Sequence, residues 1–158
     1  MYEKCKMSWT EISIRVLIAV VSGFVLGVER EIHHKPAGLR THILVSLGSA
    51  LFVLSSVHIY SSYSSLRTFD PSRVAAGVVT GIGFLGAGAI MQTKHHIKGL
   101  TTAASIWVCA SLGIASGIGA YKVVTTGLIA AIIVLVVLYP FESQLDSVET
   151  RDQDNIKE

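Results

Sequence analysis

Two histidine pairs are the residues of this chain whose type most directly indicates chemistry. His33-His34 and His95-His96 each lie beside a lysine, and imidazole is a ligand that zinc, copper and nickel prefer. Adjacent histidines do not share one face of a helix, however, and no carboxylate or thiolate pattern accompanies them. We therefore expect two polar loops with solvated histidines, no metal site and no cofactor.

Charged residues gather where long apolar runs begin or end. Glu29 and Arg30 follow the first run, Arg40 precedes the second, and Asp70 and Arg73 precede the third. Burying any of them in a membrane is costly, so each is an interfacial anchor or part of a polar site between helices. No nucleophile–base pairing and no H-E-x-x-H or G-x-S-x-G motif occurs. We expect no catalytic residue and no enzyme activity.

Arg15 is the one cation placed inside an apolar run. Glu11 lies four residues earlier, which puts the two side chains on one helical face where they can pair. The long arginine stem can also reach back to the interface. These features predict an anchor at the membrane surface.

The segment from Gly81 to Gly86 has the letters G-x-G-x-x-G. That motif binds dinucleotides only between a strand and a helix, with an acidic residue about 20 positions later. Here it lies in the middle of an apolar run, and no Asp or Glu occurs between Asp70 and Glu142. We expect no nucleotide site.

The composition shows which elements must hold these residues. The chain has 158 residues, of which 51% are hydrophobic and only 15% are charged, against about 25% charged in soluble domains. Too few polar residues are present to cover a water-facing surface. This excludes a disordered chain, a nucleic-acid binder and most small soluble enzymes.

Five apolar runs recur with a length near the roughly 20 residues that span a bilayer. Open sheet edges in lipid would leave backbone groups unpaired, so the runs are expected to be helices. The fold class predicted is all-α: a bundle of five transmembrane helices within residues 1–140, followed by a short acidic tail at 141–158. The expected spans are residues 12–28, 41–60, 74–91, 100–119 and 123–139.

Small residues indicate which helices contact protein, because helices in lipid associate by close packing. The third run is the richest in glycine, which predicts a helix at the centre of the bundle or at a dimer interface. A broken helix that lines a polar path is the alternative. The fifth run is almost wholly branched aliphatic and is expected to face lipid. The expected packing residues are Gly23, Gly27, Gly77, Gly81, Gly83, Gly86, Gly88, Gly113, Gly117 and Trp107.

Five segments in series carry a family resemblance. Residues 23–31, 35–41, 70–76, 80–90 and 99–107 together resemble the MgtC/SapB family of bacterial membrane proteins. The resemblance implies a multi-pass protein of the bacterial cytoplasmic (inner) membrane, with its N-terminus outside and its tail in the cytoplasm. It also implies a link to adaptation to low magnesium and regulation of other membrane complexes. We expect the short form, without the soluble C-terminal domain of many members.

The resemblance also implies that polar residues at the helix ends are more than interfacial anchors, although it assigns them no roles. We expect one set to cluster on the cytoplasmic side, where the first helix ends and the second and fourth begin. A second set would mark the outer mouth. The cytoplasmic set is Glu29, Arg30, Arg40, Thr41, Thr101 and Thr102, and the outer set is Asp70 and Arg73.

Two functions are consistent with these expectations. The first is a regulator or stress-adaptation factor that packs against other membrane proteins, its partners being the lipid bilayer and either a second copy, as a dimer, or another membrane protein. The alternative is a transporter or channel for Mg²⁺ or another small cation or solute. Oxygen ligands that suit magnesium occur only near the ends of the expected spans, at Glu29 and Asp70.

Overall fold

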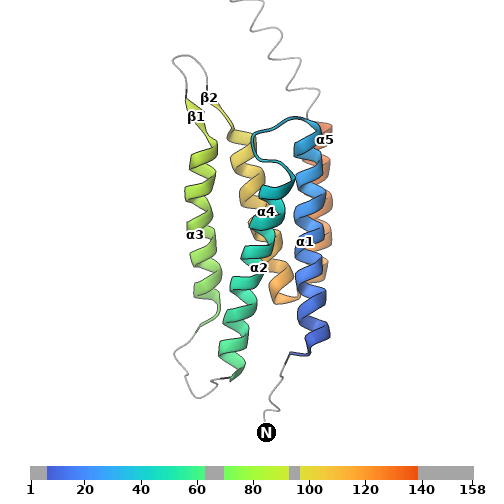
Figure 1. Ribbon diagram of the computed structural model, residues 1–158, viewed down its shortest axis with the longest axis vertical. Coiled ribbons are helices and arrows are strands. Elements are labelled where there is room, and N and C mark those ends of the chain that lie inside the picture. The colour runs from blue at the N-terminus through green and yellow to red at the C-terminus, as the bar shows by residue number, and fades with distance from the viewer. Residues whose placement is uncertain (1–6, 63–69, 93–96, 139–158) are drawn as a thin grey trace, which may run out of the picture.

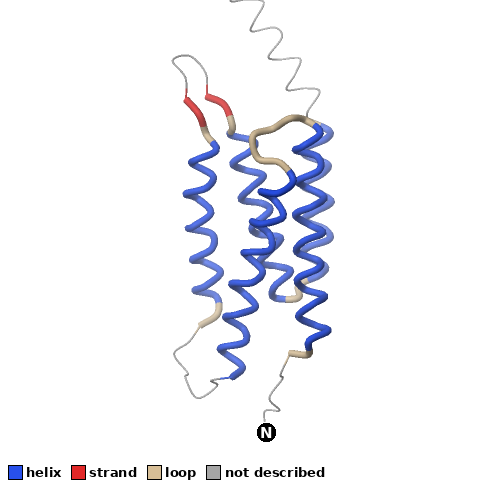
Figure 2. Tube along the Cα trace, in the orientation of Figure 1, coloured by secondary structure: helices blue, strands red, loops and turns tan. Residues whose placement is uncertain are grey.

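The computed structural model describes residues 7–62, 70–92 and 97–138. In this part of the chain five helices lie side by side along one axis and alternate in direction (Figures 1 and 2). The all-α five-helix prediction is confirmed. The expected tail at 141–158 and the pair His95-His96 lie outside the described residues. The helices are α1 (Trp9–Ile32), α2 (Leu39–Ser62), α3 (Ser72–Ala89), α4 (Leu100–Ile118) and α5 (Tyr121–Val137).

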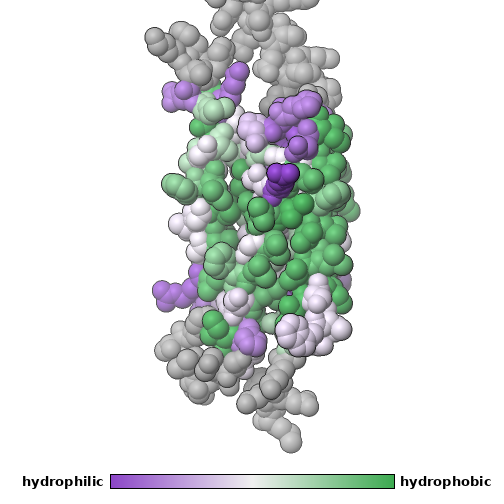
Figure 3. Space-filling model, in the orientation of Figure 1, coloured by the Kyte–Doolittle hydropathy of each residue, from purple (hydrophilic) through white to green (hydrophobic). Residues whose placement is uncertain are grey.

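The helices have the length and composition of membrane spans. In the described residues, α1 to α4 are long and apolar enough to cross a bilayer, whereas α5 has 17 residues, the lower end of the usual range of about 17–25. On the face drawn in Figure 3, apolar side chains cover most of the middle of the bundle, and hydrophilic side chains gather toward its two ends. A surface of this kind is suited to lipid.

A short hairpin joins α3 to α4, where the sequence predicts no sheet. Strands β1 (Met91–Gln92) and β2 (Ile97–Lys98) pair antiparallel. They extend beyond the end of the bundle (Figure 1), where water can satisfy the strand edges that lipid would leave unpaired. Gly99 then turns the chain into α4 with a φ of +92°, a conformation that favours glycine.

Helix α4 occupies the centre of the bundle, and it packs against all four other helices. Its side chains at Cys109, Ala110 and Leu112 are buried. The prediction that the glycine-rich third helix lies at the centre is therefore wrong for the single chain. Helix α3 lies at the edge of the bundle, and it buries only Ile82 and Gly86. The other expectation, that it forms a dimer interface, stays a prediction.

Four glycines of α1 and α4 explain this arrangement. A Cβ added to Gly23 would lie 2.6 Å from the carbonyl oxygen of His42, and one added to Gly117 would lie 2.8 Å from that of Ala50. Gly27 and Gly113 meet the α2 backbone in the same way. The backbones of α1 and α4 thus approach α2 more closely than any larger residue would allow.

The glycines of α3 have different surroundings. A Cβ added to Gly77, Gly81, Gly83 or Gly88 would have no atom within 4 Å, and Gly86 meets Ala103 at an ordinary 3.8 Å. Trp107 of α4, another expected packing residue, is 52% exposed. Within one chain, these four glycines and Trp107 do not provide the expected close packing.

Two contacts hold helix ends in place, and the first is the expected pair of Arg15 with Glu11. Arg15 pairs with Glu11, and its Nη1 also donates to the carbonyl oxygen of Gly117 at 2.8 Å, which ties α1 to the C-terminal end of α4. At the start of α3, Oδ1 of Asp70 accepts a hydrogen bond from the backbone N–H of Ser72 at 2.9 Å. This contact satisfies one of the free donors of the first turn.

Candidate functional site

A set of buried polar side chains lies where α1 ends and where α2 and α4 begin. We call Glu29, Arg30, His42, Thr102 and Ser105 the polar cluster. Arg30 is only 1% exposed and Glu29 only 7%. Nη2 of Arg30 donates to Oε1 of Glu29 at 2.7 Å, and its Nε donates to the other carboxylate oxygen. The two charges therefore compensate each other away from water.

The close approach of α1 and α2 positions this cluster. A Cβ on Gly27 would lie 2.7 Å from Cα of Leu39 and 3.3 Å from Cβ of His42. The connection between the two helices is closed by Glu31, whose Oε2 accepts the backbone N–H of Leu39 at 3.0 Å. The end of α1 and the first turn of α2 are thereby held together.

His42 connects α2 to α4. Its Nδ1 lies 2.9 Å from the carbonyl oxygen of Gly38, which only accepts, so Nδ1 carries a proton. Its Nε2 lies 3.1 Å from Oγ of Ser105, which in turn lies 2.8 Å from the carbonyl oxygen of Thr102. Cys109 adds a contact from its thiol to the carbonyl oxygen of His42 at 3.1 Å. The histidine is fully buried and satisfied on both nitrogens.

The carboxylate of Glu29 contacts a second basic side chain. Nδ1 of His33 lies 3.2 Å from Oε1 of Glu29 and 2.8 Å from the Glu29 carbonyl oxygen. Nη1 of Arg30 is buried and has no hydrogen-bond partner among the described residues. In that part of the chain, no three His, Cys, Asp or Glu residues gather in a way that could hold a metal ion. The cluster is arranged to hold helix ends together.

The structure brings the predicted cytoplasmic set together only in part. Glu29, Arg30 and Thr102 are buried, and Thr102 joins the cluster through Ser105. The other three members, Arg40, Thr41 and Thr101, are exposed. Whether any of the six has a functional role stays a prediction.

The predicted outer pair lies at the opposite end, at the start of α3. Asp70 and Arg73 are both exposed, and no ion pair joins them in the described part of the chain. Hydrogen bonds from Ser72, through its side chain and its backbone, hold the pKa of Asp70 below its ordinary value. The aspartate thus acts as a charged cap of α3.

Sequence reasoning missed His42. It is the second residue of the apolar run at 41–60, at the end where other polar residues gather. That position could have indicated a buried polar contact, because a histidine inside a membrane span needs hydrogen-bond partners when it is buried.

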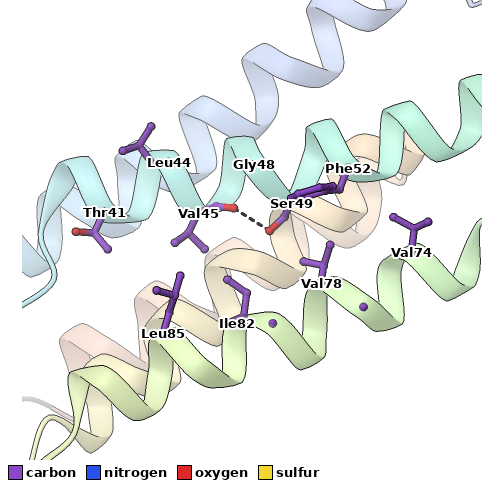
Figure 4. A pocket seen from close by; sticks show the side chains of 12 residues that line it. Thr41, Leu44, Val45, Gly48, Ser49, Phe52, Val74, Val78, Ile82 and Leu85 are labelled. Carbon is purple, nitrogen blue, oxygen red and sulfur yellow. Dashed lines mark hydrogen bonds between the residues drawn. The ribbon is translucent and has the colours of Figure 1, made fainter.

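A groove separates α2 from α3 (Figure 4). It has a volume of about 740 Å³, and six residues of each helix line it. The side-chain oxygens at its wall belong to Thr41 and Ser49, and the Ser49 hydroxyl donates to the carbonyl oxygen of Val45 at 2.8 Å. The groove is therefore almost wholly apolar. Its lining is Thr41, Leu44, Val45, Gly48, Ser49, Phe52, Val74, Gly77, Val78, Gly81, Ile82 and Leu85.

Similarity to curated proteins is extensive. The chain is 43% identical over 137 residues to the Putative magnesium transporter YhiD of Escherichia coli K12, covering 85% of this chain and 64% of that protein. It is 40% identical to Protein SrpB of Synechococcus elongatus, covering 85% of this chain and 76% of that protein. It is 41% identical to Protein MgtC of Salmonella typhimurium, covering 77% of this chain and 48% of that protein.

The matched region therefore spans less than two thirds of the E. coli relative and about half of the Salmonella relative. No solved structure matches. Residues 16–144 match the MgtC family as a whole, a region that contains all of α2 to α5 and most of α1. This chain belongs to the MgtC family.

Proposed function

We propose that this protein is a regulator of other membrane proteins, linked to magnesium homeostasis and stress adaptation. It acts in the bacterial cytoplasmic membrane, with its N-terminus outside and its C-terminus in the cytoplasm. The name of the E. coli relative, a putative magnesium transporter, supports the link to magnesium. The apolar surface in the middle of the bundle supports a membrane location (Figure 3).

The observation that carries the proposal is a contrast between two sets of glycines. Those of α1 and α4 are in tight contact with α2, whereas Gly83 of α3 faces open space. At the helical repeat of 3.6 residues, Gly83 lies in line with Ala76, Thr80 and Ala87, and all four are exposed. We call this stripe the outer face of α3. It has the small residues that allow another transmembrane helix to pack closely.

The test is recovery of a partner from mild detergent. Gly83→Leu fills the outer face. We therefore expect the variant to lose co-isolation of the partner complex and to lose the ability to support growth at low magnesium. The matched control is Gly81→Leu, the same change two residues away on the side that faces the groove. It should keep the partner. Recovery of the wild-type protein alone, or equal recovery with both variants, would contradict the proposal.

Transport of Mg²⁺ is the second candidate. Besides the name of the E. coli relative, the buried carboxylate of Glu29 favours it, since magnesium takes oxygen ligands. That carboxylate already contacts Arg30 and His33, so its oxygens have partners without a metal ion. This geometry favours a regulator over a magnesium transporter. Uptake of Mg²⁺ into proteoliposomes that Glu29→Gln or Asp70→Asn abolishes would support transport instead.

A further inference from the structure

The groove between α2 and α3 has walls but no cover within the described chain. In Figure 4, Val45 points into it from α2, and Val78 and Ile82 point into it from α3. Its volume of about 740 Å³ lies within the range of about 300–1,000 Å³ that is typical of small-molecule sites. Since both helices have the composition of membrane spans, the open side faces lipid.

The shape of the groove suits a single acyl chain. Helices α2 and α3 are antiparallel, so Thr41 and Leu85 lie at one end and Phe52 and Val74 at the other (Figure 4). From Thr41 to Phe52 the groove extends about 17 Å at a rise of 1.5 Å per residue. Half of the hydrocarbon core of a bilayer is about 15 Å. The groove therefore matches the length of a lipid chain in one leaflet.

One end of the groove carries a positive charge that forms no ion pair with the described residues. Arg40 directly precedes Thr41, which lines the groove at this end. It is exposed and makes no hydrogen bond or ion pair with the described residues, in contrast to Arg15 and Arg30. Lys98 of β2 is exposed at the same end of the molecule (Figure 1).

This charge decides which occupant fits. Basic pockets between transmembrane helices are the pattern that binds acidic lipid headgroups, and a guanidinium matches the geometry of a phosphate. An uncharged partner helix would leave Arg40 without a counter-charge. A phospholipid with a net negative headgroup supplies both the apolar chain and the phosphate.

We propose that the groove binds one anionic phospholipid. One acyl chain lies between α2 and α3, and the headgroup phosphate contacts Arg40, with the Thr41 hydroxyl and Lys98 beside it. This site is separate from the proposed function, since it uses the side of α3 opposite to the outer face. A lipid held here would fix the distance between α3 and α2.

Native mass spectrometry of the detergent-purified protein tests this directly. The protein is titrated with phosphatidylglycerol or with phosphatidylcholine of the same acyl chains. We expect preferential retention of phosphatidylglycerol, and Arg40→Gln should weaken that retention about tenfold, the effect of losing one charge-assisted contact, without changing retention of phosphatidylcholine. Gly81→Leu fills the groove and should abolish retention of both lipids.

Two controls separate this site from general charge and from folding. Arg73→Gln removes an exposed cation from the other end of α3, and Gly83→Leu adds the same bulk on the outer face. Both should leave lipid retention unchanged. If Gly81→Leu lowers the helical signal, Gly77→Leu provides a second way to fill the groove, because Gly77 also lines it in open space.

Three outcomes would overturn the proposal. The first is equal retention of the two lipids by the wild-type protein. The second is retention of phosphatidylglycerol that neither Arg40→Gln nor the groove-filling variants change. The third is a bound second copy or partner protein that Gly81→Leu removes, since the groove would then be occupied by protein.

Discussion

Arg30 and Glu29 are neighbours on α1, and both side chains are removed from water together with His42. Pairing of this kind need not add stability over an apolar pair, but removing one partner leaves an uncompensated buried charge. The cluster therefore makes the first turn of α2 dependent on the last turns of α1.

Removal of one charge from this pair should be severe. We expect Arg30→Gln to lower the free energy of unfolding by about 3–5 kcal/mol, since it leaves the Glu29 carboxylate buried with a weaker partner. Thermal unfolding in detergent, followed by circular dichroism, measures this. The exposed Arg40→Gln should change stability by less than about 0.5 kcal/mol. Equal effects of the two changes would show that burial of Arg30 is unimportant.

Asp70 gives a pH dependence with a definite sign. Because hydrogen bonds from Ser72 lower its pKa, its contribution to α3 is present above the ordinary aspartate value of about 3.9 and is lost as the pH falls below it. The protection factor of the amides at the start of α3, which is the intrinsic exchange rate at each pH divided by the observed rate, should therefore fall on acidification through this range. Asp70→Asn keeps a capping side chain and should remove the pH dependence. A wild-type profile that stays flat would contradict the capping role.

Sequence order alone predicted that Glu29, Arg30 and Asp70 lie at helix ends, because apolar runs define those ends. It did not predict which of them are buried. That depends on the rotation of each helix and on how closely Gly27 allows α2 to approach. His42 went unnoticed for the same reason, since only the packing of α1 and α4 against it makes it part of a cluster.

At the scale of the element, glycine has different surroundings in α3 and in α4. Gly113 and Gly117 of α4 pack against α2, whereas most glycines of α3 have no neighbouring atom within the described chain. Glycine density pointed to α3 as the central helix, but in the single chain the contacts belong to α4. Small residues predict that a helix packs closely against something, and they do not say whether that partner lies in the same chain.

A pair of alanine substitutions tests this distinction. Gly113→Ala would place a methyl against the backbone of Ser46, so we expect overpacking to lower stability by about 1–3 kcal/mol. Gly83→Ala meets no atom within 4 Å and gains helix propensity of up to about 1 kcal/mol, so it should be neutral or stabilising in the purified monomer. The midpoints of thermal unfolding provide the comparison. A loss of stability with Gly83→Ala alone would contradict the assignment of contacts.

At the scale of the whole molecule, the bundle has two parts. One part is tightly packed, and the other, around α3, leaves helix surface uncovered within the described chain. Helices α1, α2 and α4 are held together by close contacts at glycines and by hydrogen bonds between buried side chains. Helix α3 has open space on two sides. Composition predicted the five helices, whereas the partners that we propose for the two open sides of α3 lie outside this chain.

Photo-crosslinking in intact membranes tests the central claim, that the outer face of α3 binds another membrane protein. A photoreactive phenylalanine analogue replaces Phe84, which is 83% exposed beside Gly83. In a parallel sample it replaces Val134, which is 53% exposed on α5, the helix that the sequence predicts to face lipid. We predict an adduct with one defined membrane protein from position 84 that Gly83→Leu removes, and only lipid adducts from position 134. No protein adduct at position 84, or the same adducts at both positions, would contradict the account.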